Sequence, residues 1–204
     1  MNTDQDKISY IIGRQIGADF KAQAIEINFE TFSQGVRSSY LGEDSELAED
    51  ESATIMATFQ ADMQAAAAKI QGEMGATNLE EGLLFLEENK KREGIEVTAS
   101  GLQYLKLENG EGKTPGPEDK VEVHYEGTLI DGTVFDSSIK RNETITFPVN
   151  GVIPGWTEAL QLMKEGDTWE LTIPSDIAYG AQGAGGAIGP NAVLNFQVQL
   201  IKVL

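Results

Sequence analysis

The chain has 204 residues, of which 40% are hydrophobic, and it contains no cysteine and one histidine. This length allows one large domain or two small ones, and the hydrophobic content is enough for a real core. The lack of cysteine excludes disulfides, thiolate catalysis and Cys-ligated metals, and one histidine is too few for a His-built metal site. The net charge of −18 disfavours nucleic acid and anionic lipid as partners. We therefore expect no metal, no cofactor, no nucleic-acid partner and no membrane partner.

The first seven residues are polar and acidic. They lack the basic start and apolar run of a secretory signal, and no later segment is long enough to cross a membrane. These features predict a cytoplasmic protein. A periplasmic protein whose signal peptide had been removed would look the same.

Residues 1–93 have the pattern of helices, because prolines are absent and apolar residues recur at spacings of three and four. The stripe of the first helix comprises Ile8, Ile11, Ile12, Ile16 and Phe20. A second helix is predicted over residues 28–41, where Gly42 is placed to end it. A longer helical stretch begins near Leu47 and continues to about residue 92.

This longer stretch fits either two helices or one long helix. Gly72 and Gly75 each cost roughly 1 kcal/mol inside a helix, and Asn78 with Glu81 three residues later suits a capping box that would start a new helix. We favour one long helix.

Two short helices and one long helix cannot easily bury their apolar stripes alone, so we expect a homodimer through the N-terminal helices. The alternative is that this half packs on its own C-terminal domain. The predicted domains are a helical dimerisation domain at 1–45, a long connecting helix at 46–93 and a third domain at 94–204.

The third domain contains all six prolines and reads as an antiparallel sheet, because apolar residues alternate with polar ones. Strands are predicted at 102–107, 120–129, 144–149, 168–173 and 194–200, with one helix at 156–163. This pattern predicts an α+β fold in which a curved sheet wraps over a short helix.

Common catalytic motifs, such as GxSxG, the P-loop and HExxH, are absent. His124 alternates onto the polar face of its strand and is interpreted as a surface residue. The glycine-rich run 180–189 lacks a following helix and a lysine, which favours a flexible loop over a phosphate site. What remains is a group of aromatic residues that could be either core or the lining of an apolar ligand pocket: Tyr125, Phe135, Phe147, Trp156, Trp169, Tyr179 and Phe196.

At these residues the sequence resembles the FKBP-type peptidyl-prolyl isomerases, the tacrolimus-binding immunophilins. The resemblance covers about residues 95–204, and its blocks come in the order and spacing of the family. The matching segments are Val121-Glu-Val-His-Tyr-Glu-Gly-Thr-Leu129, Asp131-Gly-Thr-Val-Phe-Asp-Ser-Ser138, Val152-Ile-Pro-Gly-Trp-Thr-Glu-Ala-Leu160, Ile173-Pro-Ser-Asp-Ile-Ala-Tyr-Gly180 and Ile188-Gly-Pro-Asn-Ala-Val-Leu-Asn-Phe196.

The resemblance implies a proline pocket with Trp156 as its floor. The implied catalytic residues are Tyr125, Phe135, Asp136, Trp156, Tyr179 and Phe196, and the implied substrate- and inhibitor-binding residues are Ile145, Phe147, Val152, Ile153 and Ile188. The Tyr179 hydroxyl and the Ile153 N–H would bind carbonyl groups of a substrate or ligand. Ile145 stands where many members carry an aromatic residue, and Ala184 replaces a bulkier one, so both should loosen the edge of the pocket.

The N-terminal half resembles a bacterial subgroup that includes the macrophage infectivity potentiator proteins, through residues 9–17 and 78–94. This resemblance implies an isomerase that accelerates X-Pro isomerisation during protein folding, with chaperone-like client holding by a homodimer. Its partners would be proline-containing unfolded polypeptides and macrolide inhibitors of the tacrolimus and rapamycin type. The alternative is a non-catalytic holdase that binds proline peptides.

Overall fold

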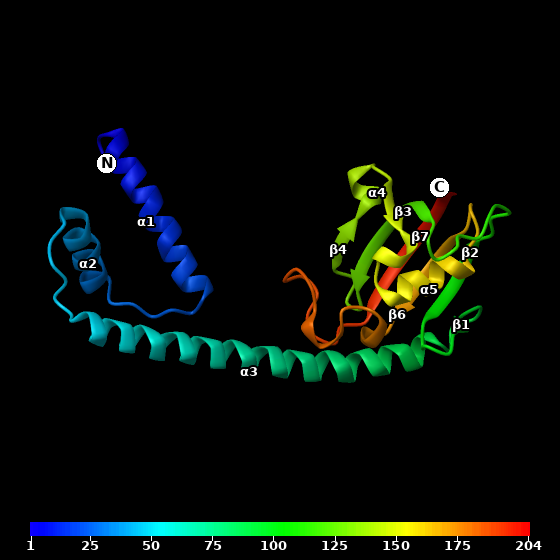
Figure 1. Ribbon diagram of the computed structural model, residues 1–204, viewed down its shortest axis with the longest axis horizontal. Helices are drawn as coiled ribbons and strands as arrows, with labels where there is room; N and C mark the ends of the chain where they lie inside the picture. The colour runs from blue at the N-terminus through cyan, green and yellow to red at the C-terminus, as the bar shows by residue number, and fades with distance from the viewer. The chain divides into compact units, whose positions relative to one another are not determined.

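The computed structural model describes residues 1–204, which divide into two compact units, Met1–Ala61 and Asp62–Leu204 (Figure 1). The division falls inside helix α3, which runs from Glu49 to Asn89. The helix predicted to connect two domains therefore contributes residues to each unit.

The first unit contains helices α1 (Asp4–Ala22) and α2 (Phe29–Leu41) and the beginning of α3. Helix α1 begins at a capping box, in which the side chain of Thr3 accepts from the backbone of Asp6 while the Asp6 carboxylate accepts from Thr3. Helix α2 is capped by the Asn28 side chain and ends at Gly42, whose φ of +72° is the left-handed conformation that glycine adopts without strain.

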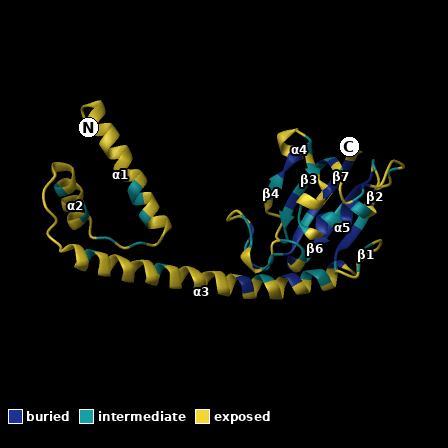
Figure 2. Cartoon of the chain, viewed as in Figure 1, coloured by how far each residue is buried: buried dark blue, intermediate teal, exposed yellow.

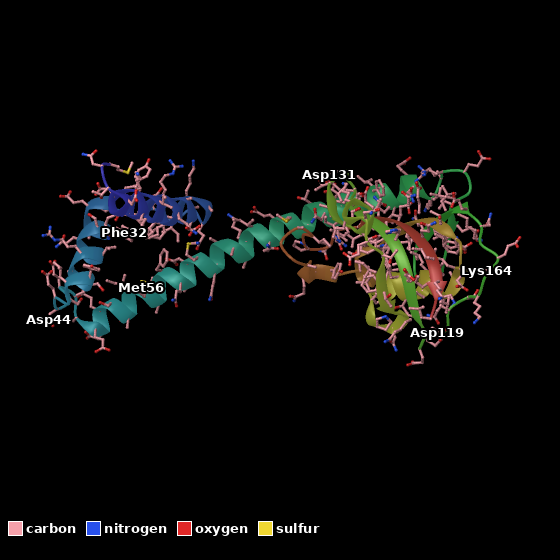
Figure 3. All side chains as sticks on the ribbon, turned by 90° about the horizontal axis from the view of Figure 1, so that it is seen from above. Phe32, Asp44, Met56, Asp119, Asp131 and Lys164 are labelled. Atoms are coloured by element: carbon pink, nitrogen blue, oxygen red, sulfur yellow. The ribbon has the colours of Figure 1, made fainter.

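No residue of the first unit is buried in the chain, and Figure 2 shows α1 and α2 almost entirely as exposed surface. The two helices touch through Phe20 and Phe32, whose rings meet edge to face at 5.4 Å; Phe32 is labelled in Figure 3. The exposed apolar side chains of this unit include Ile8, Tyr10, Ile11, Ile12, Phe29, Val36, Tyr40, Leu41, Leu47, Ile55, Met56 and Phe59. This unit consequently lacks a hydrophobic core of its own.

Helix α3 is one continuous helix of 41 residues, as favoured from the sequence. Asn78 does not begin a new helix; it lies inside α3, and its side chain donates to a tertiary partner, the carbonyl of Pro190. The buried positions of α3 are Gly75, Gly82 and Asn89. Their spacing of seven residues puts them on one face of the helix. These three residues belong to the second unit, and their face of α3 packs against the rest of that unit.

The second unit is built on an antiparallel seven-stranded sheet. Its strands are β1 (Glu96–Val97), β2 (Gln103–Glu108), β3 (Lys120–Leu129), β4 (Val134–Ser137), β5 (Ile145–Pro148), β6 (Thr168–Ile173) and β7 (Leu194–Val203). Their order is β1-β2-β6-β7-β3-β4, and β5 also pairs with β3. The five strands predicted from the sequence are present. The sequence did not predict β1, whose two residues are too few to show a period, nor β4.

Short helical segments connect these strands, and one of them, α5 (Pro154–Leu162), packs against a face of the sheet (Figure 1). The others are α4 (Ser138–Arg141), η1 (Val149–Gly151), η2 (Ser175–Ile177) and η3 (Gly180–Gln182). Helix α5 buries Trp156, Ala159 and Leu160 against the sheet. The predicted α+β fold, with a helical N-terminal part followed by an antiparallel sheet, is confirmed.

The alternation of β3 decides which of its side chains reach the core. Val121, Val123 and Tyr125 point inward and are buried, while His124 lies on the opposite face, where its Nδ1 is 3.1 Å from the Ser138 hydroxyl. In β6 both faces are buried. Thr172, on the outer face, is covered by Asn89 of α3, whose amide donates to it.

Candidate functional site

A cavity of about 450 Å³ opens between the sheet and helix α5. Its lining comprises Tyr125, Phe135, Asp136, Phe147, Gly151, Val152, Ile153, Trp156, Tyr179 and Phe196. The indole ring of Trp156 forms the floor. It meets the rings of Tyr125 at 5.3 Å, Phe196 at 5.2 Å and Phe147 at 6.0 Å, each nearly perpendicular, which is a favoured geometry for aromatic pairs.

Local structure explains why these side chains converge. Pro154 at the first turn of α5 suits a helix start and places Trp156 on the face that the sheet covers. Gly127 of β3 leaves room for two rings, since a Cβ there would lie 2.6 Å from Phe135 and 2.8 Å from Phe196. Those rings pack edge to face at 5.5 Å, so the glycine is required by the aromatic wall.

One polar group sits at the rim of the aromatic cavity. The Asp136 carboxylate accepts a hydrogen bond from the Tyr125 hydroxyl and another from the guanidinium of Arg141. Burial alone would raise the pKa of this carboxyl, but the two hydrogen bonds and the positive charge outweigh burial and hold the pKa below its usual range. Burial and the hydrogen bond to Asp136 raise the pKa of Tyr125. Asp136 is therefore charged and Tyr125 neutral near pH 7.

Three hydrogen-bond donors in the cavity wall have no partner in the chain. The Tyr179 side chain is 41% exposed and its hydroxyl forms no hydrogen bond. The backbone N–H of Ile153, at the N-cap of α5, is likewise free. The indole Nε1 of Trp156 is buried without a partner. The cavity thus combines apolar walls with a few unpaired donors, the usual composition of a small-ligand site.

Nine of the eleven site residues predicted from the sequence line this cavity. Ile145 and Ile188 do not. Ile145 is half-buried against the core opposite Val123, and Ile188 forms a two-way backbone bridge with Ala184 in the glycine-rich loop.

Sequence reasoning missed Gly151 in the lining and Arg141 beside Asp136. Arg141 is the last residue of a four-residue helix, α4, whose presence no pattern in the sequence indicates. A charged residue five positions from Asp136 gives no signal by itself, because that spacing matches neither a helical nor a strand contact.

A second cavity, of about 500 Å³, lies between α3, the glycine-rich loop and the turn that follows β3. Asp131 of this turn is labelled in Figure 3. The lining contains no aromatic residue. Although this cavity is the larger of the two, it lacks the convergent aromatic rings of the aromatic cavity.

Two further properties concern other kinds of site. No group of three or more His, Asp or Glu side chains is arranged to hold a metal ion. No helix combines the length and apolar character needed to span a bilayer.

Comparisons with known proteins find two family models along the chain. The family model described as "FKBP-type peptidyl-prolyl cis-trans isomerase" matches residues 111–201, and that described as "Domain amino terminal to FKBP-type peptidyl-prolyl isomerase" matches residues 5–105. The chain is 45% identical to "Outer membrane protein MIP" of Legionella longbeachae over 203 residues, which are 100% of this chain and 87% of the relative. It is 44% identical to "Peptidyl-prolyl cis-trans isomerase Mip" of Coxiella burnetii over 203 residues, with 100% and 88% covered.

Among solved structures, the crystal structure of FkpA from Escherichia coli matches with a TM-score of 0.74 and 33% identity. The match covers 100% of this chain and 98% of that one. Both halves of the chain are therefore similar to known proteins of one type.

Proposed function

The chain belongs to the FKBP-type peptidyl-prolyl cis-trans isomerases, and from this premise we propose that its aromatic cavity binds proline and accelerates X-Pro isomerisation in folding polypeptides. The observation that carries the proposal is the cavity itself, with a Trp156 floor, aromatic walls and unpaired donors at Tyr179 and Ile153. A proline ring is compact and apolar, and a cavity of about 450 Å³ accommodates it together with its neighbours.

The reaction needs no nucleophile. Rotation about the peptide bond is opposed by amide resonance, with a barrier of about 18–20 kcal/mol, and X-Pro exchange takes tens to hundreds of seconds. A catalyst must favour the twisted amide over both planar forms. The twisted amide is less polar than the planar one, so an apolar cavity that excludes water favours it. Lowering the barrier by about 7 kcal/mol would accelerate exchange roughly 10⁵-fold.

The polar groups would orient the substrate. The Tyr179 hydroxyl and the Ile153 N–H are free to donate to carbonyls on either side of the proline. Asp136 accepts from Tyr125 and Arg141, so it keeps the rim of the cavity fixed. In this assignment Phe135, Phe147, Val152 and Phe196 form the walls, while Ile145 and Ile188 support those walls from outside the lining.

We further propose that the first unit forms a homodimer that holds client chains. Residues 1–61 include no buried residue, yet apolar side chains cover one stripe of α1, with Ile8, Ile11 and Ile12 more than half exposed. Such a stripe is stabilised when a second copy covers it. The proposed partners are proline-containing unfolded polypeptides, and the cavity is also proposed to bind macrolides of the tacrolimus and rapamycin type.

The compartment is proposed from a relative. The Legionella longbeachae relative is named an outer membrane protein, so it gives no support to the cytoplasmic location expected from the sequence. The periplasmic alternative agrees with it, and we propose the periplasm as the compartment to test by cell fractionation. Recovery of the protein with the cytosolic fraction would reject this assignment.

Catalysis is tested with a refolding protein limited by X-Pro isomerisation and with a short proline peptide. We expect Trp156→Phe to lower kcat/KM by about tenfold, because the smaller phenylalanine ring gives the substrate less aromatic surface to contact. A tenfold loss corresponds to a barrier higher by about 1.4 kcal/mol. Trp169→Phe is the matched control, since this tryptophan also has a buried indole N–H without a partner but lies outside the cavity. Equal activity of the wild type and Trp156→Phe would reject the cavity as the site of catalysis.

Client holding is tested separately. Ile11→Glu, on the exposed stripe of α1, should convert the dimer to a monomer in analytical ultracentrifugation and weaken protection of an aggregating client, while peptide isomerisation is retained. Lys21→Gln, exposed on the opposite side of α1 from this stripe, changes the net charge by the same amount and is the control. A chain that protects clients without accelerating either X-Pro substrate would instead be the non-catalytic holdase.

A further inference from the structure

Helix α3 is hydrogen-bonded directly to the glycine-rich loop (residues 180–191). The side-chain amide of Asn78 donates to the carbonyl of Pro190 at 2.7 Å. In the opposite direction, the side-chain amide of Asn191 donates to the carbonyl of Gly75 at 3.1 Å. Each bond joins residues more than a hundred positions apart in the sequence, and together they hold the end of the loop against one turn of the helix.

The end of the glycine-rich loop is also hydrogen-bonded to the beginning of the same loop, which lies beside the aromatic cavity. The backbone N–H of Asn191 donates to the carbonyl of Gly180 at 2.8 Å. Gly180 directly follows Tyr179, which lines the cavity and whose hydroxyl has no partner in the chain. A continuous series of hydrogen bonds therefore runs from Gly75 of α3 through Asn191 to the residue next to Tyr179.

Close packing leaves the loop little room to shift toward the helix. A Cβ at Gly75 would lie 3.2 Å from Cβ of Pro190 and 3.3 Å from Nδ2 of Asn191. A Cβ at Gly189 would lie 2.9 Å from both Nδ2 of Asn78 and Sδ of Met74. All four distances are shorter than ordinary van der Waals contact, so the two glycines allow the backbones to approach.

We propose that Asn78 and Asn191 are positioning residues that fix the Tyr179 wall of the aromatic cavity by bonding the glycine-rich loop to helix α3. The proposal rests on the proposed isomerase function of that cavity. Because no hydrogen bond holds the Tyr179 hydroxyl, the ring is located only by its backbone and by packing. Loss of the bonds to α3 frees that backbone, and the donor is then no longer held where a substrate carbonyl needs it.

Three substitutions in the full chain separate hydrogen bonding from other effects. Asn78→Ala removes the donor and leaves a good helix former. Asn78→Asp keeps nearly the same volume but replaces the donor by an acceptor, which cannot bond the Pro190 carbonyl. Asn191 has a φ of +55°, so Asn191→Gly removes the side chain without adding backbone strain. Gly72→Ala, a helix position with nothing within 4 Å, is the matched control.

We expect the backbone amide resonances of Tyr179 and Gly180 to shift in all three variants and to stay unchanged in Gly72→Ala. Since a displacement of about 1 Å can cost roughly 100-fold in rate, we expect kcat/KM on a proline peptide to fall about three- to tenfold. Asn78→Asp should be at least as impaired as Asn78→Ala, which a purely volume-filling role would not produce. Activity is measured well below the melting temperature of each variant.

Wild-type kcat/KM and unshifted amides in Asn78→Ala and Asn191→Gly would overturn the proposal. A loss of activity that only follows the unfolded fraction would also overturn it, since the residues would then be structural. If the wild-type chain itself does not accelerate isomerisation, the proposed function fails, and the Tyr179 and Gly180 resonances alone decide whether α3 positions this wall.

Discussion

Tyr125 donates its hydroxyl hydrogen to the carboxylate of Asp136, one residue placed by β3 and the other by β4. In the register of the two strands Asp136 lies opposite Gly127. The hydrogen bond from Tyr125 to Asp136 therefore joins residues that are not directly opposite each other. Arg141 binds the other carboxylate oxygen. The aromatic floor and the charged rim of the cavity are therefore joined through one tyrosine.

Removing this hydrogen bond should raise the pKa of Asp136. The Tyr125 hydroxyl is one of the groups that lower this pKa against the opposing effect of burial, so Tyr125→Phe should move it upward, as followed by NMR titration of the carboxyl carbon. Tyr10→Phe, at an exposed tyrosine of α1, is the control. An unchanged Asp136 pKa in Tyr125→Phe would show that the Tyr125 hydroxyl does not lower it.

The rate of isomerisation should be flat across neutral pH. Asp136 has a lowered pKa and Tyr125 a raised one, so neither changes charge between about pH 6 and 8. His124, the one histidine of the chain, lies on the face of β3 opposite Tyr125. We expect constant kcat/KM over this range and no solvent isotope effect in a peptide assay. A bell-shaped profile would indicate acid–base catalysis instead.

Gly82→Ala should destabilise the second unit. A Cβ at this position would lie 2.7 Å from Cγ2 of Val193, a buried and β-branched residue. Overpacking costs about 1–3 kcal/mol, which exceeds the gain of about 0.5–1 kcal/mol from replacing a helical glycine. Both tryptophans lie in this unit, so urea unfolding followed by tryptophan fluorescence measures the change.

Gly72→Ala is the companion of Gly82→Ala. It lies in the same helix with nothing within 4 Å, so only the helix-propensity gain of about 0.5–1 kcal/mol applies. If both substitutions stabilise the unit, the contact between Gly82 and Val193 is not tight.

Stability should fall between pH 10 and 12 because of Tyr104. Burial, and next the hydrogen bond to Glu96 at 2.8 Å, raises the pKa of Tyr104 to about 12. A raised folded-state pKa stabilises the fold fully below the ordinary value near 10, and that contribution is lost as pH rises through 12.

The Tyr104 contribution is on the order of 2 kcal/mol, since each pKa unit corresponds to about 1.4 kcal/mol. Tyr104→Phe keeps the stacking on Trp169, whose ring lies 4.4 Å away, but does not ionise. The wild type should therefore lose more free energy of unfolding than Tyr104→Phe between these pH values. Parallel pH curves for the two proteins would contradict the shifted pKa.

Local patterns in the sequence determined the elements and the side of each element that faces the core. The alternation of β3 predicted that Val121, Val123 and Tyr125 point together, and they do. The family resemblance supplied nine of the ten residues that line the aromatic cavity. These features could be predicted because a period of two or of 3.6 is a property of neighbouring residues.

Only the tertiary structure decided what the glycines and asparagines of α3 do. From the sequence Gly75 was a weak point of a helix and Asn78 a possible cap; in the fold the Gly75 carbonyl accepts from Asn191 and the Asn78 side chain donates to Pro190. Arg141 similarly acquires its role only through Asp136. No local period encodes a contact between residues a hundred positions apart, because such contacts depend on how separately formed elements pack. The sequence thus determined which elements form, and packing decided which residues hold them together.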